Sequence, residues 1–145
     1  MDVRAINAQM VAKLLATEGE PVPEGGYGLR VIETRGRGSG VARHVPLAVV
    51  QRRGCWYLVS PDRKRDWVRN LLATPACAVI EETARLERHA EPAGGPEAAA
   101  VVAQYLEAMA VPWAIEAFPV AQDATEDEIV PHLLGMAVFV LREPA

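Results

Sequence analysis

Basic residues and glycines gather in one part of the chain, where they could hold an anion. Residues 28–70 contain ten Lys or Arg against three Asp or Glu, whereas the rest of the chain contains five against sixteen. The segment includes Gly36-Arg37-Gly38-Ser39-Gly40, followed by Arg43. A glycine-rich turn exposes backbone N–H groups that can hold a phosphate or carboxylate, and nearby arginines and a serine hydroxyl add further donors. A plain hairpin turn with solvated arginines is the alternative interpretation.

Two common nucleotide-binding motifs do not fit these glycines. The dinucleotide fingerprint needs a third glycine after two intervening residues and then a helix, but β-branched residues and Pro46 follow here. The phosphate loop of nucleotide hydrolases ends in Gly-Lys-Ser/Thr, which is absent. Nucleic acid is also disfavoured as a partner, because the chain has a net charge of −4 and shows no nucleic-acid-binding module.

A second basic group, Arg63-Lys64-Arg65, lies just before a short predicted helix. Alone, such a run is usually a solvated loop, and it gains functional meaning only if the glycine-rich segment folds beside it. Within the predicted helix, Trp67 and Asn70 are three residues apart and therefore share a face. They are either a core residue and a turn-stabilising residue, or the wall and support of a cofactor pocket, and these roles are compatible.

The sequence shows no pattern typical of side-chain catalysis or metal binding, so the catalytic residues are left unassigned. The three histidines are scattered without a triad spacing, although His44 lies inside the candidate site. Cys55 and Cys77 form no CxxC pair, so we expect no metal and a reducing, cytoplasmic location. No apolar run reaches the roughly 18–20 residues of a membrane helix, and no signal peptide is expected.

The hydrophobic pattern predicts many strands and few helices. An amphipathic helix is expected over residues 2–17, with Ile6, Met10 and Leu14 on one face, followed by a linker rich in Pro and Gly. Strands are expected over residues 29–34, 45–50, 55–60, 76–82, 83–91 and 136–141, and helices over 67–73, 96–109 and 128–134. Asp66 is the expected cap of the helix at 67–73. Residues 111–127 are expected to be irregular.

This order lacks the regular strand–helix alternation of a doubly wound sheet. It favours a mainly β fold of the α+β class, a small antiparallel barrel with peripheral helices. The length of 145 residues and an apolar content of 50% suit one domain over residues 1–145. We expect an N-terminal helix and linker over residues 1–26 and a barrel with inserted helices over residues 27–145.

Several of these motifs together resemble the deazaflavin-dependent nitroreductase-like family of split β-barrel oxidoreductases. That family shows a Thr-x-Gly-Arg-x-Ser-Gly-x-x-Arg-x-x-Pro-Leu segment, a strand ending in Ser and a Trp-x-x-Asn-Leu helix. The matching residues here are Thr34, Gly36, Arg37, Ser39, Gly40, Arg43, Pro46, Leu47, Ser60, Trp67, Asn70 and Leu71. The resemblance covers roughly residues 29–80 and resumes weakly at residues 137–141. Agreement in order and spacing over separate motifs is more specific than any single motif.

The resemblance implies a six-stranded antiparallel split β-barrel of the FMN-binding type that binds coenzyme F420, a deazaflavin with a phosphodiester and a polyglutamate tail. It implies that Arg37, Ser39, Gly40 and Arg43 meet the phosphate, that Arg63, Lys64 and Arg65 meet the glutamates, that Pro46, Leu47 and Ser60 face the ring, and that Trp67 and Asn70 close the site. The cofactor would pass a hydride to a small electron-poor substrate, such as a quinone, an activated alkene or a nitro compound. Trp113 and Phe118 are the candidates for a substrate wall.

The chain departs from the family pattern at two positions, so alternatives to F420 are also considered. Gly38 and Pro61 stand where basic residues are often found. FMN is the alternative cofactor, because its single phosphate needs fewer basic contacts. A protein that stores or carries a flavin or a tetrapyrrole without catalysis is the alternative of a different class. Related split barrels often form homodimers, so a homodimer is a further expectation.

Overall fold

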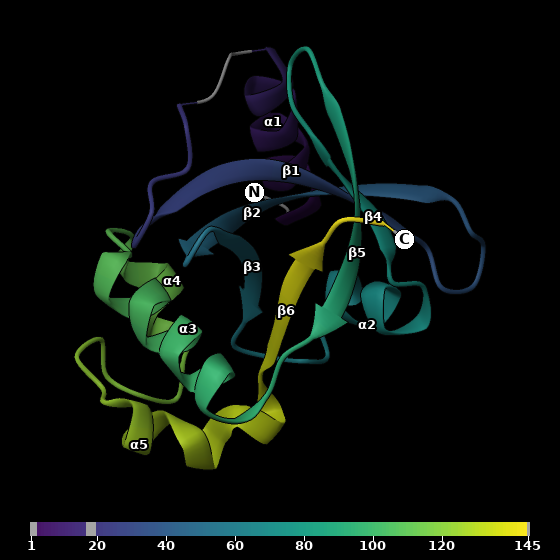
Figure 1. The fold of residues 1–145 in the computed structure, drawn as a ribbon. Helices are drawn as coiled ribbons and strands as arrows, with labels where there is room; N and C mark the ends of the chain where they lie inside the picture. Colours follow the sequence, from purple (N-terminus) through teal and green to yellow (C-terminus); the bar gives the residue numbers. More distant parts are fainter. Residues whose placement is uncertain (1–2, 17–19, 145) are drawn as a thin grey trace.

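The computed structural model describes residues 3–16 and 20–144 and shows a small β-barrel with helices around it (Figure 1). The elements are α1 (Val3–Ala16), β1 (Tyr27–Arg35), β2 (Ala42–Arg52), β3 (Cys55–Ser60), α2 (Asp66–Ala73), β4 (Ala76–Ile80), β5 (Arg85–Pro92), α3 (Gly95–Ala108), α4 (Pro112–Glu116), α5 (Glu126–Ile129), the 3-10 helix η1 (Val130–Gly135) and β6 (Ala137–Arg142). The predicted order of helices and strands is confirmed, with α4 as an addition.

The six strands close into a barrel in the order β1-β2-β3-β6-β5-β4, and every pairing is antiparallel. β1 is central to the closure, because it pairs with β2 along its whole length and with β4 at Val31, Ile32 and Glu33. β2 and β3 are joined by Arg53 and Gly54, whose φ angles of 53° and 75° suit a tight two-residue hairpin. The predicted six-stranded antiparallel barrel is therefore confirmed.

Alternate residues of the strands fill the barrel interior, which we call the barrel core. Ile32, Val49, Leu58 and Phe139 are almost completely buried there, each from a different strand. Trp67, Val68 and Leu71 of α2 join the same cluster. α2 therefore packs against the barrel core, and this packing fixes the position of the residues on its outer side.

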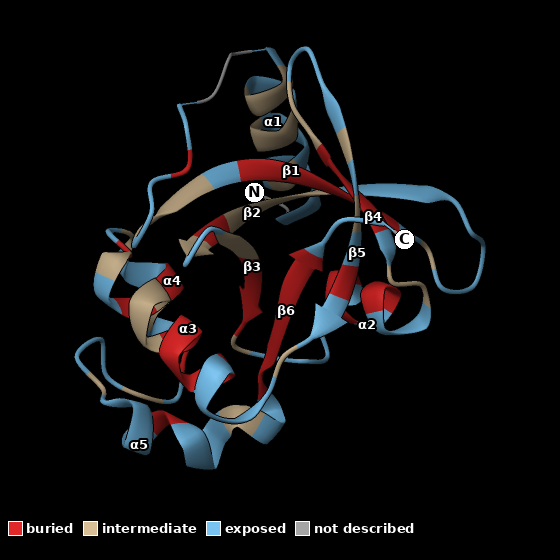
Figure 2. Cartoon of the chain, in the orientation of Figure 1, coloured by how far each residue is buried: buried red, intermediate tan, exposed pale blue. Residues whose placement is uncertain are grey.

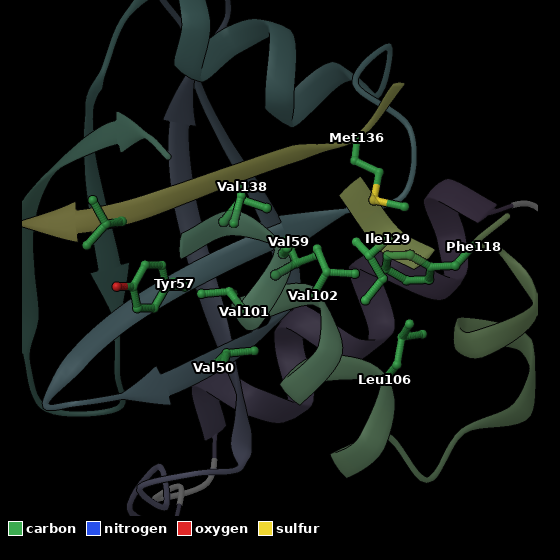
Figure 3. Packing of buried hydrophobic residues seen from close by; sticks show 13 residues of the cluster. Val50, Tyr57, Val59, Val101, Val102, Leu106, Phe118, Ile129, Met136 and Val138 are labelled. Atoms are coloured by element: carbon green, nitrogen blue, oxygen red, sulfur yellow. The ribbon is translucent and has the colours of Figure 1, made fainter. Parts of the chain in front are cut away.

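A second cluster, the outer core, lies between α3 and the opposite face of the sheet (Figure 3). β2, β3 and β6 contribute Val50, Tyr57, Val59, Val138 and Val140, and α3 contributes Ala98, Ala99, Val101, Val102 and Leu106. Burial is concentrated on these elements, as Figure 2 shows for α3 and β6. The small alanines allow α3 to approach the strands closely, so this layer forms by apolar contact.

The opening helix is present but is packed less tightly than its pattern predicts. α1 contacts β1 and β2, and a half-buried stripe runs along it through Asn7, Met10, Val11, Leu14 and Leu15. None of its residues is buried, and Ile6, which we expected on the packed face, is 41% exposed. The ends of the predicted helix, residues 2 and 17, lie outside the described residues.

Some predicted boundaries are wrong by a few residues. The helix expected over 128–134 is α5 followed by η1, and the segment expected to be irregular contains α4. The strands expected over 76–82 and 83–91 run over Ala76–Ile80 and Arg85–Pro92, because Glu81 and Ala84 form a turn through a 2.8 Å hydrogen bond. Glu81 and Glu82 thus lie in the connection between β4 and β5 and not in a strand.

Candidate active site

The glycine-rich segment forms a compact turn between β1 and β2, here called the Gly-Arg turn (residues 36–41). Gly36 N–H donates to the Val41 carbonyl at 2.8 Å, and Gly40 N–H donates to the Gly36 carbonyl at 2.7 Å. Val41 N–H donates to Ser39 Oγ at 3.2 Å, and Gly40 has a φ of 72°, which favours glycine. At the tip of the turn, the N–H groups of Gly38 and Ser39 have no acceptor among the described residues.

Asn70 of α2 holds this turn against the barrel. Its Oδ1 accepts hydrogen bonds from the Arg37 backbone N–H at 3.2 Å and from Arg37 Nη1 at 2.9 Å, and its Nδ2 donates to Thr34 Oγ1 at 3.2 Å. Asn70 is 4% exposed and Thr34 is 1% exposed. Since buried polar groups are costly without partners, this network fixes one arrangement of turn and helix. The hypothesis that the Asn70 amide fixes the loop above the site is consistent with this geometry.

Asp66 does not cap α2, contrary to our prediction. The cap position is Arg65, and no side chain there bonds the free N–H groups. The Asp66 carboxylate instead accepts from Arg37 Nη2 at 3.1 Å, and its backbone carbonyl lies 3.5 Å from Arg37 Nη1. The ion pair with Arg37 draws the carboxylate away from its own helix. Consequently the Arg37 side chain is engaged within the protein, and its predicted contact with the cofactor phosphate stays a prediction.

Arg43 lies beside the Gly-Arg turn. In the β1–β2 register it is opposite Thr34, so the two side chains project from the same face of the sheet. Its Nε is 3.7 Å from the position that a Cβ on Gly36 would take. Arg43 is exposed, and among the described residues no carboxylate lies within ion-pair distance of it.

The second basic group lies next to this turn in space, as the anion-site hypothesis requires. Arg65 precedes Asp66, the partner of Arg37, so the loop 63–65 and the Gly-Arg turn meet at the start of α2. Arg63 N–H donates to the Gly135 carbonyl at 2.9 Å, and Arg63 Nη1 donates to the Leu134 carbonyl at 3.0 Å. Lys64 and Arg65 are exposed and form no ion pair within the described ranges 3–16 and 20–144.

The remaining cofactor-binding candidates are mostly packed. Ser60 is fully buried, and its Oγ donates to the Asp62 carbonyl at 2.7 Å and accepts from Asp62 N–H at 3.2 Å, which shapes the start of the basic loop. Trp67 is 6% exposed and its ring lies 6.1 Å from that of Phe139 in the barrel core. Pro46 and Leu47 are half-buried in β2. Their roles toward a cofactor ring stay predictions.

The two candidates for a substrate wall lie in different environments. α4, which carries Trp113, is far from α2 in Figure 1. Trp113 on α4 is 70% exposed. Phe118 belongs to the outer core, is 6% exposed and packs its ring 5.2 Å from that of Tyr105 (Figure 3). The structure thus places Phe118 in the core rather than on an open wall. A contact between Phe118 and a substrate stays a prediction.

His44, which we singled out within the candidate site, belongs to a separate ion network. It is opposite Glu33 in the β1–β2 register, one position from the Arg43–Thr34 pair and so on the other face of the sheet. His44 Nε2 lies 3.0 Å from Glu33 Oε1, and Arg85 Nη2 lies 2.5 Å from Glu33 Oε2. The hydrogen bond from Arg85 is the main cause that lowers the pKa of Glu33. Burial acts in the opposite direction, and the hydrogen bond with His44 lowers the pKa further.

A second polar contact that the sequence did not reveal fastens α3 to the sheet. Tyr57 Oη donates to Glu97 Oε2 at 2.8 Å, and Tyr57 is 5% exposed. Burial, followed by the Glu97 hydrogen bond, raises the pKa of Tyr57 to about 12. The hydroxyl therefore remains a donor at neutral pH. Glu97 lies in the first turn of α3, where a carboxylate is also favoured by the helix dipole.

The donor set at the Gly-Arg turn fits a polyanionic ligand. The tip of the turn offers the N–H groups of Gly38 and Ser39, and a Cβ at Gly38 would meet nothing within 4 Å, so the tip opens onto free space. Arg43 lies beside the turn, and the exposed cations Lys64 and Arg65 lie on the loop that leads into α2. This combination suits a phosphodiester followed by carboxylates better than a neutral ligand. Among the described residues no three His, Cys, Asp or Glu side chains cluster to hold a metal, and no described helix is long and apolar enough to cross a membrane.

The fold is shared with several solved structures. The chain resembles a structure of a heme binding protein from Mycobacterium smegmatis at 18% identity and a TM-score of 0.55, covering 94% of this chain but 50% of that protein. It resembles a protein described as a domain-swapped dimer at 21% identity and a TM-score of 0.58, covering 96% and 92% of the two chains. It also resembles an F420-H2 dependent reductase (FDR-A) at 23% identity and a TM-score of 0.51, covering 86% and 100%. No curated protein matches the sequence.

The family-model comparison places this barrel in the F420-dependent oxidoreductase class. The model of the F420H(2)-dependent quinone reductase family matches residues 3–129, and the chain belongs to this family. Membership confirms the oxidoreductase class and coenzyme F420 as the cofactor, both of which the motifs between Thr34 and Leu71 predicted.

Proposed function

We propose that this chain uses reduced F420 to reduce a small quinone, with the cofactor's anionic part held at the Gly-Arg turn. The observation that carries the proposal is the junction of this turn with α2. Asn70 fixes the turn, and the N–H groups of Gly38 and Ser39 have no acceptor among the described residues. Arg43 lies beside the turn, and the exposed Lys64 and Arg65 lie just before α2.

The residues of the chain bind and orient, and the chemistry comes from the cofactor. When bound, the deazaflavin supplies a hydride, and the quinone takes up that hydride and one proton to become a hydroquinone. Arg43 and the tip of the turn would bind the phosphodiester, and Lys64 and Arg65 the glutamates. Asn70 and Thr34 hold the turn rigid, so that little ordering is required when the cofactor binds.

An apolar cavity beside the basic loop supports a quinone as the substrate. It has a volume of about 240 Å³ and is lined mainly by apolar groups from the β5–α3 connection, η1, β6 and α2. Arg63 lies at its edge, and Gly94 and Gly95 line it with no side chain. Placing a leucine at Gly94 should raise KM for a short-chain quinone and leave the Kd for F420 unchanged. An unchanged KM would place the acceptor elsewhere.

Parallel titrations test the proposed cofactor. Purified protein is titrated with F420 and with FMN while tryptophan fluorescence is followed, and oxidation of reduced F420 is then measured with quinone, enone and nitro acceptors. We expect saturable binding of F420 and turnover with the quinone. Tight FMN binding without a response to F420 would overturn the proposal. Binding of F420 without turnover on any acceptor would favour a carrier.

Two further parts of the proposal concern assembly and location. A homodimer is supported by the exposed apolar residues of α1, Val3 and Ile6, which are 69% and 41% exposed, and by the domain-swapped dimer among the similar structures. A cytoplasmic location is supported by the free thiols of Cys55 and Cys77. Light scattering on the eluting protein measures the mass, and fractionation of cells measures the location.

A further inference from the structure

Asp66 is a carboxylate in the middle of the basic site. Its side chain is 81% exposed, and it lies next to Arg65 in sequence and 3.1 Å from Arg37 Nη2. It is not needed to cap α2, since it bonds no N–H of its own helix. A negative charge at this position opposes the binding of any polyanion, and the capping of α2 does not explain why it is there.

The bonds of Arg37 show what the carboxylate does. Nη1 donates to Asn70 Oδ1 and Nη2 to Asp66 Oδ1, so both ends of the guanidinium fork are bonded to the protein's own side chains. The guanidinium nitrogens of Arg37 that bond Asn70 and Asp66 are therefore engaged before any ligand arrives, whereas Arg43 has no ion-pair partner among the described residues. Asp66 keeps Arg37 in its structural position and also lowers the positive potential at the rim.

We propose that Asp66 sets the affinity of this site and its preference for ligand charge. It is a positioning residue for Arg37 and a repulsive charge toward the anionic ligand, so that the site binds its cofactor less tightly than its cations alone would allow. The inference rests on the proposed function, in which the ligand is F420. It requires that removing the charge of Asp66 strengthens binding, and that the gain grows with the number of charges on the ligand.

The test compares Asp66→Asn with Asp66→Glu and with Glu116→Gln. An asparagine oxygen can still accept from Arg37, so Asp66→Asn removes the charge and keeps the hydrogen bond. Glu116→Gln makes the same change in net charge on exposed α4, far from α2 in Figure 1. Dissociation constants are measured for F420 with a long glutamate tail and for F420 without glutamates, at about 0.01 M and about 1 M salt, where the screening lengths are about 30 Å and about 3 Å.

We expect Asp66→Asn to bind tailed F420 about three- to tenfold more tightly than wild type at low salt, with a smaller gain at high salt and for the ligand without glutamates. Asp66→Glu and Glu116→Gln should bind like wild type. The proposal is overturned if Asp66→Asn binds tailed F420 no more tightly than wild type. It is also overturned if Glu116→Gln gains as much affinity as Asp66→Asn, because the gain would then come from the net charge of the protein. Circular dichroism verifies folding, and Asp66→Ser is the second uncharged variant.

A failure of the proposed function is separated from a failure of this inference by a second probe. Inorganic tripolyphosphate carries several negative charges and no deazaflavin, and its binding is measured by calorimetry on the same variants. If neither wild type nor Asp66→Asn binds F420, the proposed cofactor is wrong. The inference then stands if Asp66→Asn binds tripolyphosphate more tightly than wild type, and it fails if the two bind it equally.

Discussion

The junction of the Gly-Arg turn with α2 and the outer core under α3 are held together in opposite ways. A few polar side chains hold the junction, and Asn70 alone makes three hydrogen bonds there. Apolar side chains hold the outer core, where Leu106, Val101 and Val102 are fully buried. Apolar contacts are non-directional and tolerate small shifts, whereas buried hydrogen bonds require one geometry.

This difference explains which region carries the site. A ligand that is recognised through charge needs donors at fixed positions, and a hydrogen-bonded junction provides them at some cost in stability. The outer core provides stability and anchors the sheet from which the junction extends. Stability and ligand affinity should therefore respond differently to changes in the two regions.

The largest effect on stability is expected in the outer core. Leu106→Ala should lower the free energy of unfolding by about 3 kcal/mol, because it removes a fully buried side chain and leaves a cavity. Urea denaturation measures this loss, with Leu72→Ala, at a position 45% exposed, as the control. The folded variant should bind F420 like wild type. If Leu106→Ala also lowered the affinity for F420, α3 would belong to the site, and the outer core and the junction would no longer differ in function.

At the junction, one change should affect both properties. Asn70→Ala leaves the Arg37 N–H and the buried Thr34 hydroxyl without their partner, which should cost about 2 kcal/mol. Since the turn is then free to move, F420 affinity should also fall, by about tenfold. Asn7→Ala on α1 is the matched control and should leave F420 affinity unchanged. If Asn70→Ala lost stability but bound F420 like wild type, Asn70 would have a structural role only.

Local patterns were sufficient to predict the barrel. The alternation in residues 55–60 predicted β3 with its observed bounds. α4 was missed because a helix of five residues offers too little periodicity to detect. The packed face of α1 was predicted only in part, because Ile6 turns toward solvent and the stripe passes through Val11 and Leu15 instead.

The position of the candidate site could be predicted from the sequence, but the hydrogen bonds and ion pairs between its residues could not. Spacing within the motifs identified Arg37, Arg43 and Asn70 as neighbours of a candidate site. The partner of Arg37, however, is Asp66, which is 29 residues away in the chain, and Asp66 was expected to cap its own helix. Glu33 of β1 likewise pairs with Arg85 of β5, although β4 lies between these two strands in the barrel. Such pairs depend on the closure of the barrel, which no local pattern encodes.

A single hydroxyl tests how much the outer core depends on its polar contact. Tyr57→Phe removes the bond to Glu97 while the ring stays in place, and it should cost about 1 kcal/mol in unfolding free energy. Tyr105→Phe is the control, because Tyr105 packs its ring on Phe118 and has no hydrogen bond from its hydroxyl within the described chain. If both variants lose the same stability, the Tyr57–Glu97 bond contributes nothing specific, and the outer core is held by apolar contact alone.

Removing one cation should weaken the junction's ligand affinity without weakening its fold. Arg43→Ala should raise the Kd for F420 about fivefold at low salt and less at high salt, because an exposed charge is screened. Thermal unfolding should hardly change, since Arg43 has no ion-pair partner among the described residues. Arg88→Ala on β5 is the matched control. Equal effects of the two variants on the Kd would place Arg43 outside the site.

The smallest effect is expected in the Glu33–His44–Arg85 network, on the sheet face opposite Arg43. The pKa of Glu33 is lowered from its ordinary value of 4.5, mainly by the hydrogen bond from Arg85. A carboxyl group with a lowered folded-state pKa stabilises the protein above its unfolded-state pKa, and this contribution is lost as pH falls through the folded-state value. Wild type should therefore have a higher Tm than Glu33→Gln at neutral pH.

Melting curves from neutral pH downward measure this difference, which should shrink as the pH falls below 4.5. Glu116→Gln, at an exposed position, is the control and should show no pH-dependent difference from wild type. A difference in Tm that stays constant at every pH would mean that Glu33 contributes through packing and not through its charge. F420 affinity should be the same in wild type and Glu33→Gln at neutral pH, because this network faces away from the junction. An altered affinity would show that both faces of β1 and β2 act on the ligand.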